Sequence, residues 1–195
     1  MLRRLMTLTA LVLTAGWLAG CASPQYLQPS PERTITVPSI GQGQAVSVTA
    51  VDGRQSEQIG TRSGNAMSTS VISVPAGTLI PGLQDEAERA LRDMGFQPTT
   101  QAADGRPGLT LTLQRLDYGR QDSRPMLDKA QLESVLEVTA RRGGETYSGT
   151  YTSSLSQEFA LSPGLKKNQA MVERVLSDGL NRIFRDQALG RFLAR

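Results

Sequence analysis

The fold of this chain is decided by the stretch LESVLEVTARRGGETYSGTY, residues 132–151. Apolar residues in its first half alternate with Glu133, Glu137 and Arg141, which predicts a strand with one buried and one solvated face. Gly143-Gly144 is typical of a two-residue hairpin turn. The alternation then resumes with tyrosine and glycine on one side and serine and threonine on the other. The stretch therefore predicts a long antiparallel β-hairpin.

The rest of the chain adds shorter strands and two helices. Alternating or β-branched runs predict strands at residues 34–37, 45–51, 70–74 and 109–113, with a bulge near Gln114–Arg115 where the apolar phase slips. Apolar residues spaced three and four apart predict helices over residues 78–94 and 162–183. Together these elements predict an α+β two-layer sandwich, with a mainly antiparallel sheet of about five to six strands and two helices packed on one face.

The N-terminal end carries the most specific motif. Cys21 is the only cysteine and closes the run Leu18-Ala19-Gly20-Cys21, behind Arg3, Arg4 and a short apolar stretch. This order resembles a bacterial lipobox and predicts a cleaved signal peptide over residues 1–20, with acylation of Cys21. The alternatives are an ordinary secretory signal and an uncleaved helix, but a membrane span needs about 20 apolar residues.

The mature chain divides into two parts. Residues 21–33 are expected to form a lipidated N-terminus and a flexible tether, because Pro24, Pro29 and Pro31 break helices and their neighbours are polar. The alternative is an ordered extension that lies on the domain. Residues 34–195 are expected to form a single globular α+β domain.

Composition excludes several functions. The chain has 21 Lys and Arg against 18 Asp and Glu, and loss of Arg3 and Arg4 leaves 19 against 18, without a dense basic patch. We therefore expect no nucleic-acid partner. The absence of histidine removes Ser-His-Asp triads and histidine metal sites. No phosphate-binding loop occurs. We expect no cofactor, no metal and no enzymatic activity.

Carboxylate chemistry and a polar loop remain as candidate sites. Asp52, Asp117 and Asp122 lie at strand ends or in loops, and a cell-wall glycan hydrolase built on them is the least favoured hypothesis. The most distinctive polar cluster is a possible contact loop for a ligand or partner, formed by Asp52, Arg54 and Arg62. The structural alternative is an Asp-capped turn in which the arginine pairs with a nearby acid.

Several motifs follow one another along the chain: the lipobox, the strand ending Val51-Asp52-Gly53-Arg54, Ile59-Gly60, the helix with Leu79, Leu83 and Leu91 before Gly95, the strand Leu109–Leu113, the hairpin and the helix Val172–Ile183. In this order they resemble the YajG family of bacterial lipoproteins. The resemblance implies an envelope lipoprotein with a small α+β domain and no established reaction or ligand. No catalytic residue follows from it.

The expected function follows from the anchor and the missing catalytic motifs. We expect a non-enzymatic accessory or interaction protein that faces the periplasm, is held at the membrane by its lipid and contacts an envelope protein. Ala22 after the cysteine favours the outer membrane by similarity with lipoprotein sorting rules, and the inner membrane stays open. The alternative is a carrier or sensor of a small lipid or cell-wall ligand, held in a groove lined by Leu83, Leu91 or Val175.

Overall fold

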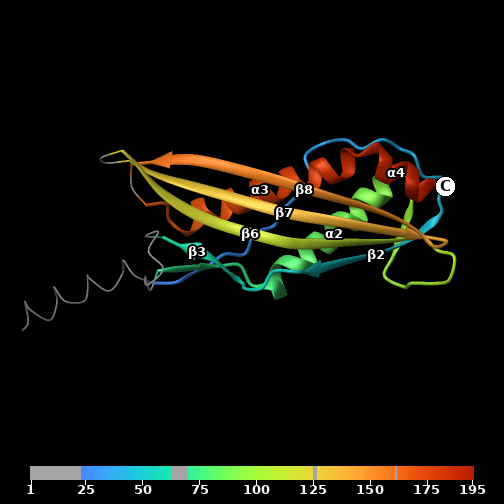
Figure 1. Cartoon of the computed structure of the whole chain (residues 1–195), viewed down its shortest axis with the longest axis horizontal. Helices are drawn as coiled ribbons and strands as arrows, with labels where there is room; N and C mark the ends of the chain where they lie inside the picture. Colours follow the sequence, from blue (N-terminus) through green and yellow to red (C-terminus); the bar gives the residue numbers. More distant parts are fainter. Residues whose placement is uncertain (1–22, 63–69, 125–126, 161) are drawn as a thin grey trace, which may run out of the picture.

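The computed structural model describes residues 23–62, 70–124, 127–160 and 162–195. Within these ranges it contains three helices and one eight-stranded sheet (Figure 1). The strands are β1 (Gln25–Tyr26), β2 (Ala45–Asp52), β3 (Gln58–Thr61), β4 (Val71–Ser73), β5 (Gln97–Thr99), β6 (Gly108–Arg124), β7 (Leu127–Arg142) and β8 (Glu145–Phe159). The helices are α2 (Ala76–Asp93), α3 (Leu165–Arg185) and α4 (Gln187–Ala194). Cys21 and the signal segment lie outside the described residues.

Strand β6 is the centre of the sheet. One of its edges pairs antiparallel with β7, which pairs antiparallel with β8. Its other edge pairs parallel first with β2 and then with β3. The sheet continues from β2 to β5 and from β3 through β4 to β1. The predicted hairpin is confirmed as β7 and β8, and so is the bulge in β6, where the register shifts between Leu113 and Arg115.

The α+β class is confirmed, but the description of the sheet needs correction. The sheet has eight strands instead of five to six, and four of its seven strand pairs are parallel. The predicted strand at residues 34–37 does not form, and α4 adds a third helix. The strands that the sequence missed have two to four residues, too few to show an alternating pattern.

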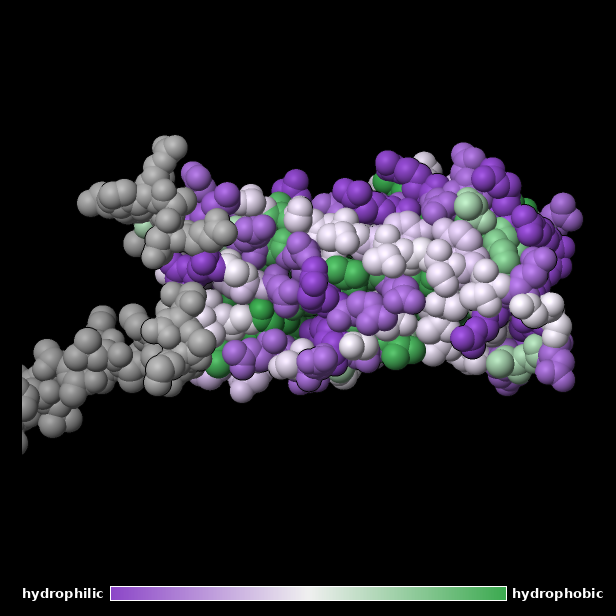
Figure 2. Space-filling model, viewed as in Figure 1, coloured by the Kyte–Doolittle hydropathy of each residue, from purple (hydrophilic) through white to green (hydrophobic). Residues whose placement is uncertain are grey.

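The core lies between the sheet and the helices. In Figure 1, α2 and α3 cover one face of the sheet, α2 behind β2 and α3 behind β7 and β8. Buried residues of β7 alternate with partly exposed ones, so the strand buries one face against α3, as at Leu132, Leu136 and Val138. The opposite face of the sheet is open, and Figure 2 shows a surface that is mostly hydrophilic or neutral from this side.

The segment expected as a flexible tether is instead packed on the domain. Residues 25–34, which we call the strap, begin as β1, whose partner is β4. Odd-numbered residues of the strap turn inward, and Leu27, Pro29 and Pro31 are buried. The composition predicted a solvated segment because most of its polar residues are even-numbered and face outward, whereas the polar side chains of Gln25 and Arg33 are buried. The ordered alternative is therefore the correct description from Gln25 onward.

The strap is fixed to α3 by a repeating set of hydrogen bonds. Backbone N–H groups of Gln28, Ser30, Glu32 and Thr34 donate to side chains of Gln169, Glu173, Ser177 and Asn181. Every second residue of the strap meets every fourth residue of α3, because two extended residues advance about 6.6 Å and four helical residues about 6 Å.

The strap is also tied to α2 through a buried charge. The Arg33 Nε donates to Glu86 Oε1 at 3.3 Å, and both side chains are almost fully buried. The same guanidinium also bonds Asp93 at the end of α2. The strap therefore connects the two long helices that cover the sheet.

Candidate functional site

The sheet is interrupted along one edge of β6. Strand β2 pairs with β6 as far as Leu113, and β3 meets it again at Tyr118. Between these points, Gln114–Asp117 has no strand partner on that side among the described residues. Because β2 leaves the sheet at its end and β3 joins it only later, the loop between them stands away from β6.

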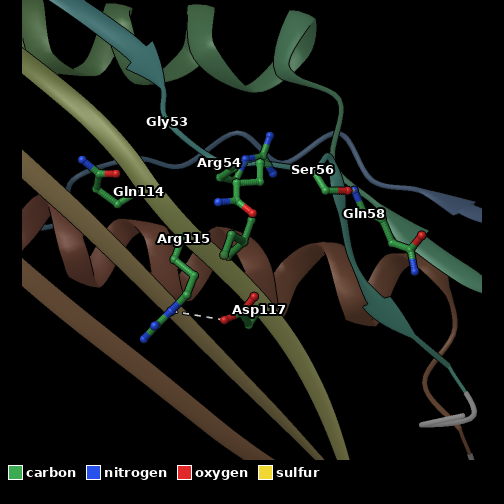
Figure 3. A pocket seen from close by; sticks show the side chains of 9 residues that line it. Gly53, Arg54, Ser56, Gln58, Gln114, Arg115 and Asp117 are labelled. Atoms are coloured by element: carbon green, nitrogen blue, oxygen red, sulfur yellow. Dashed lines mark hydrogen bonds and ion pairs between the residues drawn. The ribbon is translucent and has the colours of Figure 1, made fainter. Parts of the chain in front are cut away.

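A polar pocket fills this interruption, and we call it the window pocket. Its volume is about 400 Å³. One wall is the β2–β3 loop and the start of β3, with Gly53, Arg54, Ser56 and Gln58, and the other is β6, with Gln114, Arg115 and Asp117 (Figure 3). The volume lies in the range of small-ligand pockets, but the walls are polar, unlike the mostly apolar walls of such sites.

Gly60 closes one end of the window pocket. It pairs with Tyr118, and a Cβ atom at Gly60 would lie 2.1 Å from the Tyr118 carbonyl oxygen. No side chain fits at that separation, so glycine is needed for β3 to rejoin β6.

The Asp52–Arg54 ion pair organises the loop wall. Arg54 Nε donates to Asp52 Oδ1 at 2.8 Å, and Arg54 Nη2 donates to Asp52 Oδ2 at 2.8 Å and to the Val74 carbonyl at 3.0 Å. The side-chain hydrogen bonds from Arg54 hold the pKa of Asp52 below its usual value, against the opposing effect of burial. This is the Asp-capped turn with a paired arginine that the sequence offered as the structural alternative.

The Arg54 side chain is only 3% exposed and is not fully satisfied. Among the residues that the structure describes, its buried Nη1 atom has no hydrogen-bond partner. A buried donor without an acceptor costs free energy. Arg54 is therefore a donor held beside the pocket with part of its bonding capacity unused.

The opposite wall carries exposed charges. Arg115 bonds Asp117, with Nε 3.2 Å from Oδ2, and also bonds Glu133 on β7. The side chains of Arg115 and Asp117 are 54% and 62% exposed. Gln114 donates from Nε2 to Glu137 at 2.8 Å. These groups present both donors and acceptors to solvent at the mouth of the pocket.

The predicted contact loop is only partly assembled. Asp52 and Arg54 are in contact, whereas Arg62 follows β3 and does not line the window pocket. Sequence reasoning missed Gln114 and Arg115 as site residues. The signal that could have found them is the phase slip in β6, because bulges often re-aim side chains at sites.

Two of the carboxylates considered for hydrolysis, Asp52 and Asp117, are each paired with an arginine. Asp52 is held ionised by Arg54, whereas a general acid needs a raised pKa. Asp117 lies on the opposite wall in an exposed ion pair. The side chain of Asp122 is outside the described residues.

The described part of the chain lacks two features, one typical of metal centres and one of membrane-spanning proteins. It contains no group of three acidic, cysteine or histidine residues that could hold a metal ion. It also contains no helix long and apolar enough to cross a membrane.

A second polar cluster joins the hairpin to the C-terminal helices. The hydroxyls of Tyr147 and Tyr151 donate to Asp186 Oδ2 at 2.7 and 2.8 Å, and Asp186 Oδ1 accepts from the Ala188 backbone N–H at 2.7 Å. Burial raises the pKa of both tyrosines. Burial would raise the pKa of Asp186 as well, but the hydrogen bonds from the tyrosines and the helix backbone hold it below its usual value.

The described residues form a small α+β domain with a polar pocket at the interruption of its sheet. The chain belongs to a family of uncharacterized lipoproteins, the YajG family, which matches residues 31–194. The resemblance noted from the sequence is thereby confirmed. Membership points to an envelope-associated, lipid-anchored protein.

Two of the solved structures that are similar to this chain share its fold at low sequence identity. Protein XCC0632 from Xanthomonas campestris is 14% identical, with 88% of this chain and 97% of that chain covered and a TM-score of 0.54. An uncharacterized protein is 12% identical, with 84% and 98% covered and a TM-score of 0.53. A minor lipoprotein from Acinetobacter baumannii is 17% identical, with 76% and 92% covered and a TM-score of 0.46. None of the curated proteins matches this chain.

Proposed function

We propose that this protein is a non-enzymatic accessory lipoprotein of the bacterial envelope. In this proposal Cys21 carries the acyl chains, the signal over residues 1–20 is removed, and the domain faces the periplasm from the outer membrane. Support comes from the lipoprotein family and from the lipobox ahead of Ala22. The lipid would fix the location, and the domain would contact another envelope protein.

The observation that carries the interaction role is the window pocket. It places a stretch of β6 that has no strand partner on one edge, among the described residues, beside polar side chains of both charges. An exposed strand edge can bind an extended segment of a partner through its main chain, while neighbouring pockets select the side chains. The window pocket therefore suits a short, extended, polar segment of an envelope protein.

The ligand-carrier alternative has less support. Leu83, Leu91 and Val175, which would line an apolar groove, are fully buried in the core. None of them lines the window pocket. The helix–sheet interface at these residues is packed, and the strap covers part of the helical layer.

The test is photo-crosslinking of the intact lipoprotein in cells. A photoreactive phenylalanine replaces Gln55, which is exposed and lines the window pocket, or Gln187, an exposed glutamine on α4. We expect a reproducible protein adduct from position 55 and none from position 187. Equal adducts from both positions, or none from position 55 in correctly lipidated protein, would overturn the interaction role.

The anchor is tested separately. Metabolic labelling with palmitate should label the wild type and not Cys21→Ser, and density fractionation should place the label in the outer membrane. Label in the inner-membrane fraction would correct the location without affecting the crosslinking result.

A further inference from the structure

Two of the exposed apolar side chains gather at the end where the chain enters the domain. In the described ranges the exposed large apolar residues are Tyr26 (63%), Val51 (40%) and Leu165 (45%). Tyr26 belongs to β1 and Leu165 opens α3. The two elements are in direct contact, because Asn168 Nδ2 of α3 donates to Gln25 Oε1 of β1 at 2.7 Å.

The same end carries positive charge. Lys166 and Lys167 follow Leu165 and are exposed, and the Lys167 ammonium lies 5.6 Å from the centre of the Phe159 ring. The nearby acidic residue Glu158 is paired with Lys129 across the β7–β8 ladder, so the negative charge of Glu158 already has a basic neighbour. We call the set Tyr26, Leu165, Lys166 and Lys167 the entry face.

This combination has the composition of a membrane-surface contact. Tyrosine is enriched at the headgroup level of membranes, where its ring is half solvated. Lysines near an anionic surface each contribute about fivefold to binding, and an apolar side chain beside them adds buried area. A single acyl chain anchors weakly, so a second contact of this kind strengthens attachment.

The entry face also lies within reach of the proposed anchor. Four residue steps separate Cys21 from Gln25, which is the first residue of β1. Such a segment spans at most about 14 Å when fully extended. Because the strap fixes the chain from Gln25 onward, only this short segment links the domain to the anchor. The link is too short to let the entry face turn away from the membrane.

We infer that the entry face rests on anionic phospholipid headgroups of the membrane that holds the lipid anchor. This inference depends on the acylation of Cys21 proposed above. It orients the whole domain: the long axes of β6, β7 and β8 extend from the membrane outward, and the β7–β8 turn and α4 lie at the far end (Figure 1).

The test measures the distance of each end from the bilayer. Cys21 is the only native cysteine and its sulfur is acylated in the mature protein, so an introduced cysteine is the only free thiol. Ala160→Cys places a fluorophore beside the entry face, and Ala103→Cys places one in the exposed loop before β6, at the far end. The full-length lipoprotein is reconstituted in vesicles of phosphatidylethanolamine and phosphatidylglycerol that contain headgroup-nitroxide lipid.

We expect strong quenching at position 160 and little at position 103. The pair Lys166→Glu with Lys167→Glu should lower the ratio of docked to undocked molecules by at least roughly 25-fold, because loss of each lysine costs about fivefold and the added carboxylates are repelled by the anionic surface. The matched control, Arg185→Glu with Arg191→Glu, makes the same charge change at exposed positions near the far end and should leave quenching unchanged.

The outcomes separate the two proposals. Protein that lacks acyl mass on Cys21 and fails to float with vesicles contradicts the anchor. Protein that is acylated and floats, yet shows equal quenching at both positions or no response to the lysine changes, overturns the orientation alone.

Discussion

At the scale of single residues, two ion pairs at the window pocket differ in burial. The Arg54 side chain is 3% exposed, and its planar guanidinium meets both carboxylate oxygens of Asp52. Arg115 makes a comparable pair with Asp117 in solvent. Buried charges depend on their partners far more than solvated ones do.

We expect Arg54→Met to lower the free energy of unfolding by about 2–3 kcal/mol, because Asp52 loses its partner and Val74 loses a donor. Arg115→Met, the matched surface change, should cost less than about 1 kcal/mol. Urea unfolding followed by circular dichroism measures both values. Similar losses in the two variants would show that the Asp52–Arg54 pair does not support the loop.

Asp186 makes stability depend on pH. Its pKa in the folded protein is lower than its ordinary value of 3.8. The stabilisation is therefore complete above about pH 4 and is lost as the pH falls through the lower folded value. We expect the difference in unfolding free energy between wild type and Asp186→Asn to be largest at pH 7 and to shrink below pH 4. A difference that stays constant from pH 7 to pH 3 would contradict this assignment.

At the scale of elements, the junction of β3 with β6 depends on the absence of a side chain. We expect Gly60→Ala to destabilise the protein by about 1–3 kcal/mol, because the new methyl group would overlap the Tyr118 carbonyl. Gly77→Ala is the control, since a Cβ there meets no atom within 4 Å. Its effect should be neutral or slightly stabilising, because alanine favours the helix. Thermal unfolding of both variants measures the two changes in stability, and an equal loss in Gly77→Ala would contradict the prediction.

The strap makes a second prediction at this scale. Leu27 is fully buried, so Leu27→Ala should cost about 2–4 kcal/mol. The neighbouring Gln28→Ala should have little effect, because the Gln28 side chain faces solvent and only its backbone bonds α3. If the segment were a free tether, the two variants would be equally stable in denaturant titration.

At the scale of the whole molecule, the sequence predicted what depends on local patterns. The β7–β8 hairpin has 15 and more residues in each strand and a glycine turn, so its alternation is unambiguous. The Asp52–Arg54 pair was also predicted as one alternative, because its members are two residues apart. Both features depend on residues that lie close together in the sequence.

Features that depend on distant partners could not be predicted in the same way. The parallel pairing of β2 with β6 joins residues about 60 positions apart, and so does the meeting of Arg54 with Arg115 at one pocket. Burial of the strap requires a groove that exists only after α2 and α3 have packed. The residue pattern within one segment does not indicate a surface that other elements form.

The bonds between the strap and α3 also set the order in which the chain can fold. They join residues 141 to 147 positions apart, so the first described residues need the last long helix. Contacts of such separation form late, since a large loop must close first. A chain exported from its N-terminus cannot complete its native state until almost all of it has crossed the inner membrane. For the lipoprotein proposed above, the strap can dock only after α3 has been exported, so the folded domain does not compete with the acylating enzymes for Cys21 before then.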